Sequence, residues 1–201
     1  MVEEFNLLVC GVGGQGVLTL SRIIALSALK SNFKVRVGET LGMSQRGGIV
    51  NSFVRFGKNV LSPLFEKGMA DAVIALDYVE AARSLQYASK RTVFLVDSNT
   101  IPPLSTILGL ESLPDLDHVK RFFKENAVKA YFFNAFSIAS SLSLPTSNTV
   151  MLGVFGRLFQ KIFDRNVLIS ALREIVPAKY VEKNIEAFQF GWRLMDDNAA
   201  F

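Results

Sequence analysis

The sequence predicts an α/β fold of three layers, in which helices cover both faces of a mixed, mostly parallel sheet. Three observations carry this prediction. A glycine-rich loop at residues 11–16 joins an apolar run to a helix-patterned stretch. Continuous apolar runs at residues 72–76 and 92–96 are typical of central strands covered on both faces. From residue 150 onwards the apolar spacing is that of amphipathic helices.

The first elements are expected in the order strand, helix, strand. Residues 5–10 form an apolar strand-like run, residues 17–29 carry a helical pattern, and residues 34–39 alternate as a half-buried strand does. Together they predict one βαβ unit, which is followed by a polar, glycine-containing loop at residues 40–48.

A β-hairpin is expected next, at one edge of the sheet. Residues 49–56 alternate between apolar and polar side chains, residues 57–59 carry a Gly-Lys-Asn turn signal, and Val60 and Leu61 follow. An antiparallel pair at this point makes the predicted sheet mixed.

The remaining elements complete the three layers. Residues 78–88 predict a crossover helix between the two central strands, and residues 130–133 predict a further strand. Pro145 and Pro177 mark helix starts or breaks in a helical C-terminal third. No repeat or flexible linker divides the chain, so residues 1–201 are expected to form a single domain. The apolar residues at helical spacing are Val150, Val154, Leu158 and Ile162, then Val181, Ile185, Phe188, Trp192 and Met195.

Half of the residues are hydrophobic and 17 are phenylalanine, which is high for a monomer that is not covered by a partner. A membrane span needs about 20 apolar residues in succession, and polar residues such as Arg22, Asn134 and Arg157 interrupt every apolar stretch. No basic-then-apolar leader precedes the first strand. We therefore expect a cytoplasmic chain without a membrane segment, covered by a partner and forming homo-oligomers when isolated.

The single cysteine, Cys10, excludes an internal disulfide and any cysteine-rich zinc or iron–sulfur site built by this chain alone. The net charge of +4 comes from scattered basic residues rather than a run, so no nucleic-acid partner is expected. We predict no metal site in this chain.

The glycine-rich loop is the first candidate binding site. Its glycines allow a sharp turn and bring backbone N–H groups to the N-terminus of a helix, where a phosphate is favoured. Glu39 lies at the end of the second predicted strand, where a dinucleotide-binding, Rossmann-like fold places a ribose-binding acid. The alternative is a tight turn that needs glycine only for packing. The candidate residues are Gly11, Gly13, Gly14, Gln15 and Gly16.

A second candidate segment follows the second predicted strand. It presents a hydroxyl, an amide and a guanidinium between glycines, and Arg46 has the planar fork that binds a carboxylate or phosphate. The alternative is a surface loop with one solvated arginine. The candidate residues are Ser44, Gln45, Arg46, Gly47 and Gly48.

Other polar residues favour structural roles. Asp77 is placed to cap the following helix, and Glu80 lies in its first turn. His118 is the only histidine and is expected to be solvated at a helix start, while Cys10 is expected to be a small buried strand residue. No residue is assigned a catalytic role.

Several ordered segments resemble the gamma-type subunits of 2-oxoacid:ferredoxin oxidoreductases, and resemble most the beta subunit of the indolepyruvate branch. The resemblance covers nearly the whole chain, although Thr40 stands where an aliphatic or small residue is more common. The segments that carry it are residues 11–17, 39–48, 54–57, 70–71, 75–77, 80–83, 101–103, 148–153 and 177–184.

The resemblance implies a role in oxidative decarboxylation of a 2-oxo acid, such as an aryl pyruvate, to an acyl-coenzyme A. The complex would use thiamine diphosphate, Mg²⁺, iron–sulfur clusters and coenzyme A, and would pass electrons to ferredoxin. This chain lacks a Gly-Asp-Gly segment and a cysteine set, so those cofactors would belong to a large alpha subunit. The two candidate loops would close the active site or contact a cofactor.

Two alternatives remain open at this stage. The chain could serve a pyruvate or 2-oxoglutarate enzyme of the same family, because this subunit encodes substrate choice poorly. It could also be an independent NAD(P)- or nucleotide-binding protein. The observations behind this alternative are only the glycine spacing and Glu39.

Overall fold

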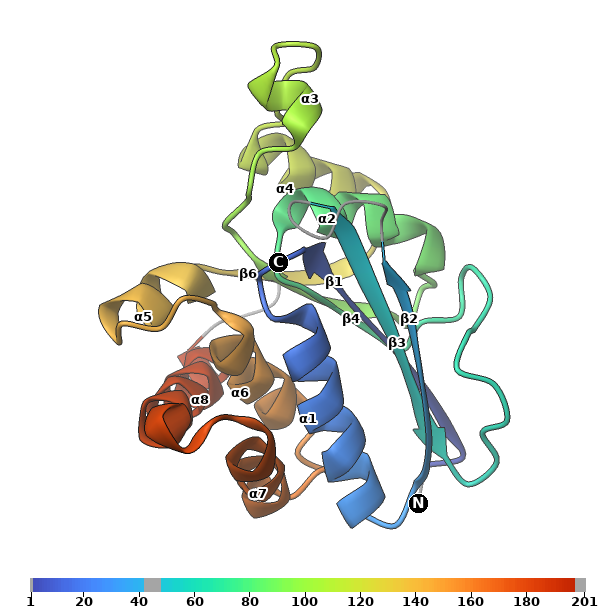
Figure 1. The fold of residues 1–201 in the computed structure, drawn as a ribbon. Coiled ribbons are helices and arrows are strands. Elements are labelled where there is room, and N and C mark those ends of the chain that lie inside the picture. Colours follow the sequence, from blue (N-terminus) through green and yellow to red (C-terminus); the bar gives the residue numbers. More distant parts are fainter. Residues whose placement is uncertain (1, 42–47, 198–201) are drawn as a thin grey trace.

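The computed structural model describes residues 2–41 and 48–197. Its six strands form one sheet in the order β2-β3-β1-β4-β5-β6 (Figure 1). β1, β4, β5 and β6 are parallel to one another, whereas β3 is antiparallel to both β1 and β2. The predicted mixed, mostly parallel sheet is confirmed. The strands are β1 (Glu4–Val12), β2 (Lys34–Leu41), β3 (Ile49–Gly57), β4 (Ala72–Ala75), β5 (Val93–Asp97) and β6 (Lys129–Phe133).

Helices cover both faces of the sheet, which confirms the three layers (Figure 1). One face carries α1 (Val17–Lys30), α5 (Ala135–Ser141), α6 (Asn148–Leu158), α7 (Arg165–Ile175) and α8 (Val181–Asp197). The other carries α2 (Tyr78–Arg83), the 3₁₀ turn η1 (Ser84–Tyr87) and α4 (Leu116–Glu125). A second 3₁₀ turn, η2 (Ala178–Tyr180), precedes α8, and α3 (Leu104–Ile107) lies in a protruding segment.

β1 shows why the central strands are apolar throughout. Leu7 and Val9 pack with α1, α6 and α8, whereas Leu8 and Cys10 pack with α2 and α4. Successive side chains point to opposite faces of a strand, and both faces are buried here, so both sets must be apolar.

The hairpin at the sheet edge is confirmed, but the predicted pairing is wrong. β3 pairs with β2 from Val50 to Gly57, and Val60 and Leu61 lie outside the strands. β3 also pairs with β1, so it lies between the two strands of the predicted βαβ unit. The alternation of residues 49–56 identified a strand but contained no information about its neighbours.

The helices differ from the prediction at their ends. The helix expected over residues 78–88 is α2 followed by η1, and α6 ends before Ile162. Pro145 precedes α6 and Pro177 precedes η2, as expected of helix boundaries.

Two glycines set the contact between α6 and α8. A Cβ at Gly153 would lie 2.7 Å from the backbone nitrogen of Trp192, and a Cβ at Gly191 would lie 2.8 Å from the carbonyl carbon of Val150. The two backbones are therefore too close for any side chain at these positions, a packing that the helical spacing alone did not reveal.

Large apolar side chains remain exposed around α3. Ile107, Leu108 and Leu110 are 68%, 63% and 74% exposed, on the segment that projects from the body in Figure 1. Among the described residues, no helix is both long and apolar enough to cross a lipid bilayer.

Candidate functional site

The glycine-rich loop lies at the carboxyl end of β1, directly before α1. Gly14 and Gly16 have φ angles of +104° and +85°, in the left-handed region where other residues are strained. Gly16 also approaches Asn148, whose Nδ2 donates to the Gly16 carbonyl at 3.3 Å. The backbone conformation therefore requires glycine at both positions, and the packing of α6 requires it at Gly16 as well.

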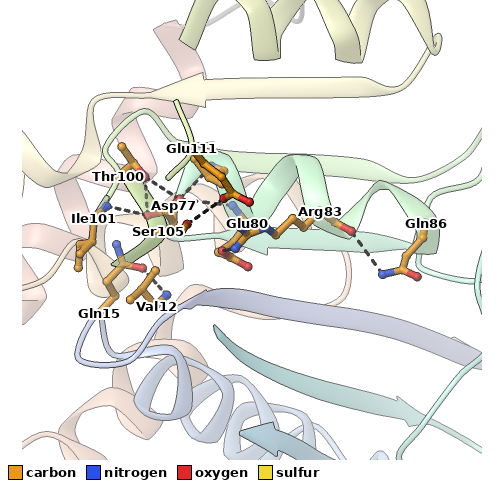
Figure 2. Close-up of polar contacts among 11 residues, drawn as sticks. Val12, Gln15, Asp77, Glu80, Arg83, Gln86, Thr100, Ile101, Ser105 and Glu111 are labelled. Atoms are coloured by element: carbon orange, nitrogen blue, oxygen red, sulfur yellow. Dashed lines mark hydrogen bonds and ion pairs between the residues drawn. The ribbon is translucent and has the colours of Figure 1, made fainter. Parts of the chain in front are cut away.

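Gln15 folds back into the loop (Figure 2). Its Oε1 accepts the Val12 N–H at 2.7 Å, and the residue is 8% exposed. A Cβ at Gly11 would lie 2.7 Å from the same oxygen. Gln15 thus stabilises the turn from inside, and Gly11 leaves room for it.

The structure brings Gly48 to the glycine loop. The Gly13 N–H donates to the Gly48 carbonyl at 2.9 Å, because β1 and β3 pair antiparallel up to Val12 and Ile49. The other candidates of the second segment, Ser44, Gln45, Arg46 and Gly47, lie outside the described residues.

Two backbone N–H groups of the loop have no hydrogen-bond partner in the described part of the chain. Within residues 2–41 and 48–197, the N–H groups of Gly14 and Gly16 have no hydrogen-bond partner, and no side chain caps α1. Free N–H groups and the positive end of the helix dipole favour an anion. The loop therefore fits a phosphate or carboxylate group.

Two adjoining clefts flank this loop and share Gly14, Pro145 and Thr146. The larger, of about 660 Å³, lies toward the C-terminal helices and is also lined by Asn148 and Asn184. The smaller, of about 290 Å³, extends over the carboxyl end of the sheet and is lined on that side by Asn99, Ile101, Phe136 and Ser147. Pockets at this sheet edge are the usual ligand sites of open α/β sheets.

Asp77 holds part of the wall of the smaller cleft. It is fully buried at the end of β4 and accepts the Val79 N–H at 2.9 Å, which confirms its predicted role as helix cap. It also accepts the Ile101 N–H at 2.9 Å and the Thr100 hydroxyl at 2.9 Å (Figure 2). The second role joins two loops that are distant in sequence, so the sequence analysis did not include it.

Asp97 lies at the equivalent end of β5 and is also fully buried. Its Oδ1 accepts the N–H groups of Asn99 at 3.3 Å and Phe136 at 3.4 Å, while its Oδ2 has no hydrogen-bond partner among the described residues. Burial raises the pKa of this carboxyl, and the nearby Ser147 hydroxyl and the backbone N–H groups oppose that rise. The sequence analysis missed this residue.

The variant Asp97→Asn is expected to gain stability relative to the parent chain as the pH rises. Because the pKa of Asp97 is raised in the folded state, folding favours the protonated form. Stability is therefore lost between the ordinary pKa and the raised one as the pH increases. Asparagine keeps an oxygen acceptor and removes this loss.

Thermal unfolding of both chains from pH 4 to pH 8 measures the effect, with Asp115→Asn, at an exposed position, as the control. If the difference in melting temperature between Asp97→Asn and the parent did not change with pH, this account would be contradicted.

The structural predictions for His118, Cys10 and Glu80 are confirmed. His118 is exposed in the first turn of α4. Cys10 is buried, and desolvation raises the pKa of its thiol to about 12, so it does not ionise near neutral pH. Glu80 lies in the first turn of α2, is only 3% exposed and pairs with Arg83 at 2.5 Å (Figure 2); burial raises its pKa.

No group of metal-ligating side chains occurs within the described ranges.

The strand order differs from that of a dinucleotide-binding fold. Such folds place the acid-bearing second strand beside the first, whereas here β3 separates β2 from β1. Neighbouring strands are about 4.8 Å apart, so Glu39 lies one strand farther from the glycine loop than the dinucleotide fingerprint requires.

The chain matches a protein-family model and a curated relative in sequence. Residues 6–194 match the family model described as pyruvate ferredoxin/flavodoxin oxidoreductase. The indolepyruvate oxidoreductase subunit IorB of Thermococcus kodakarensis is 34% identical over 192 residues, which cover 94% of this chain and 95% of that protein.

Two solved structures share the fold. The gamma subunit of a keto/oxoacid ferredoxin oxidoreductase from Geobacter sulfurreducens superposes with a TM-score of 0.71 at 21% identity, covering 96% of each chain. A 2-oxoglutarate:ferredoxin oxidoreductase from Magnetococcus marinus gives a TM-score of 0.73 at 20% identity, covering 99% of this chain but 32% of that one. The same fold therefore occurs both as a separate chain and as part of a longer one.

Proposed function

The chain belongs to the pyruvate ferredoxin/flavodoxin oxidoreductase family, and from this premise we propose that it is the small subunit of a 2-oxoacid:ferredoxin oxidoreductase that acts on indolepyruvate or a related aryl pyruvate. The single observation that carries the proposal is the 34% identity to an indolepyruvate oxidoreductase subunit over almost the full length of both chains. The reaction would be oxidative decarboxylation to an acyl-coenzyme A.

The exposed apolar segment supports a role within a complex. Ile107, Leu108 and Leu110 are each more than half exposed, and a partner would bury them. The partner would be a large alpha subunit that carries thiamine diphosphate, Mg²⁺ and the iron–sulfur clusters and passes electrons to ferredoxin. Thiamine diphosphate would supply the carbanion chemistry of decarboxylation when bound to that complex.

The glycine loop would close the active site of the complex. The N–H groups of Gly14 and Gly16, which have no hydrogen-bond partner among the described residues, fit a phosphate of coenzyme A or of the thiamine cofactor, and the two flanking clefts give such a ligand room. The adjoining segment at residues 44–48 would add a hydroxyl, an amide and Arg46 to the same surface. Gln15 and Gly11 would act by holding the loop in shape.

A second candidate differs only in substrate. The similarity in fold to a 2-oxoglutarate enzyme and the 27% identity to a pyruvate synthase subunit, PorC, of Methanothermobacter marburgensis make pyruvate and 2-oxoglutarate the alternatives. An independent NAD(P)-binding role has less support, because β3 separates Glu39 from the glycine loop.

Co-expression with the candidate large subunit tests the proposal. Under anaerobic conditions, the purified complex is expected to reduce a dye in a coenzyme A-dependent reaction, with higher kcat/KM for indolepyruvate and phenylpyruvate than for pyruvate or 2-oxoglutarate. A complex that prefers pyruvate or 2-oxoglutarate would select the second candidate. Absence of both complex and activity, together with saturable NADH binding by the chain, would refute both.

The variant Gly13→Val is expected to lower the activity of this complex at least tenfold while the melting temperature changes little. Gly13 is not among the glycines with a positive φ, so valine adds no left-handed strain there, and because Gly13 and Gly14 both line the smaller cleft, the larger side chain is expected to reduce the space beside the Gly14 N–H. Gly13→Ala, which adds one methyl group, is the matched control and is expected to lose less activity. Equal losses of activity and stability in Gly13→Val would mean that the loop has only a packing role.

A further inference from the structure

β6 is an open edge of the sheet. It is the last strand in the order and, among the described strands, it pairs only with β5 (Figure 1). Every second residue of an edge strand points its backbone N–H and C=O away from the sheet, where another strand can bind. The side chains of Tyr131 and Phe133 belong to one face of the sheet, and those of Ala130 and Phe132 face α4.

A small apolar cavity lies beside this edge, on the α4 face. It has a volume of about 140 Å³. A cavity of about 150 Å³ with apolar walls accepts benzene, so one phenyl ring or branched aliphatic side chain fits. The residues that line the cavity are Phe123, Val128, Ala130 and Phe132, with Lys120, Arg121 and Lys124 around them.

Most of the basic residues around the cavity lack acidic partners among the described residues. In the described part of the chain, Arg121, Lys124 and the neighbouring Lys129 form no ion pair. Lys120 lies 3.5 Å from Asp117, and its Nζ is 5.9 Å from the centroid of the Phe132 ring. No acidic residue lines the cavity. The electrostatic complement of this surface is therefore an acidic partner.

We propose that the β6 edge binds an extended acidic segment of a partner protein, which adds a strand to the sheet and places an aromatic or branched aliphatic side chain in the cavity. Strand addition satisfies the open backbone groups, and the anchor side chain fills the cavity. Residues two positions from the anchor point to the same face, so acidic residues there would reach the lysines of α4.

A small aryl carboxylate would match the cavity and the charge but would leave the strand edge open. The three observations together therefore favour a polypeptide. This surface is distinct from the clefts at the glycine loop, with which its cavity shares no lining residue, so the inference does not depend on the proposed function.

The test is an NMR titration of the ¹⁵N-labelled full chain with a blocked peptide of sequence Thr-Glu-Val-Phe-Val-Glu-Thr. Saturable shifts of the amides of residues 129–133 are expected, weakening with added salt. The peptide with Ala in place of Phe, and the peptide with Lys in place of both Glu residues, are each expected to bind at least tenfold more weakly.

Charge reversal of the protein provides the matched comparison. The double variant Arg121→Glu/Lys124→Glu changes only exposed side chains and is expected to lower the affinity for the acidic peptide at least tenfold. Lys161→Glu, an exposed site on the α6–α7 connection, is expected to bind as the parent does. Melting temperatures of all variants confirm that each is folded.

Two results would overturn the inference. The first is the absence of shifts at residues 129–133 with the acidic peptide at millimolar concentration. The second is a titration in which phenylacetate shifts the cavity residues as strongly as the peptide while neither moves the amides of the strand edge. That outcome would assign the cavity to a small carboxylate.

Discussion

Replacing Asp77 by alanine is expected to lower the free energy of unfolding by about 3 kcal/mol or more, because several buried donors lose their acceptor together. The Val79 and Ile101 N–H groups and the Thr100 hydroxyl all donate to this carboxylate, which is fully excluded from solvent. Urea unfolding of the full chain measures the loss. The smaller cleft should also open, because Ile101 lines it.

Asp164→Ala is the matched control for this prediction. Asp164 caps α7 through one bond, to the Asn166 N–H at 2.7 Å, and is exposed. Its loss is expected to cost about 1 kcal/mol, as an isolated helix cap does. If Asp77→Ala cost no more than Asp164→Ala, the contacts of Asp77 to Thr100 and Ile101 would contribute nothing to stability.

Gly153→Ala is expected to destabilise the chain by about 3 kcal/mol or more, although alanine favours a helix by about 1 kcal/mol over glycine. The added Cβ would lie 2.7 Å from the backbone nitrogen of Trp192, so α6 and α8 must separate. Since α6 begins at Asn148, which contacts Gly16, the shift would also disturb the glycine loop. Urea unfolding and activity of the complex report the two effects.

Gly156→Ala, on the same helix, separates backbone crowding from the general effect of adding a methyl group. Its Cβ would meet the side chains of Leu168 and Trp192, at 2.6 and 3.1 Å, and these can adjust. We expect a loss of about 1 kcal/mol at most, in line with the lower end of overpacking costs. Similar losses in the two variants would show that α6 and α8 can move apart freely.

The elements that were predicted correctly are those specified by local patterns. The glycines of residues 11–16, the apolar runs of β4 and β5, and the capping role of Asp77 each depend on residues close together in sequence. The features that were missed depend on distant residues. Asn148 reaches Gly16 from 132 positions away, and Asp97 reaches Phe136 from 39 positions away.

The second candidate segment also shows the difference between what nearby residues and distant residues determine. The predicted βαβ unit would bring this segment to the same sheet edge as the glycine loop, because the carboxyl ends of parallel strands meet there, and Gly48 does lie beside Gly13. The physical cause is different, because β3 enters the sheet between β1 and β2 and brings its first residue to the end of β1. Alternation along a strand records which face each side chain takes, not which strand lies beside it.

By itself the sequence determined the α/β class, the loop that separates β1 from α1 and the likeness to one enzyme family, since these follow from short patterns and from ordered segments along the chain. Only the tertiary structure decided the order of the strands, the pair of clefts that meet at Pro145 and Thr146, and the close contact at Gly153. The reason is physical: strand pairing and helix contact arise from backbone groups that every residue shares, so the side chains along one segment do not identify its partner.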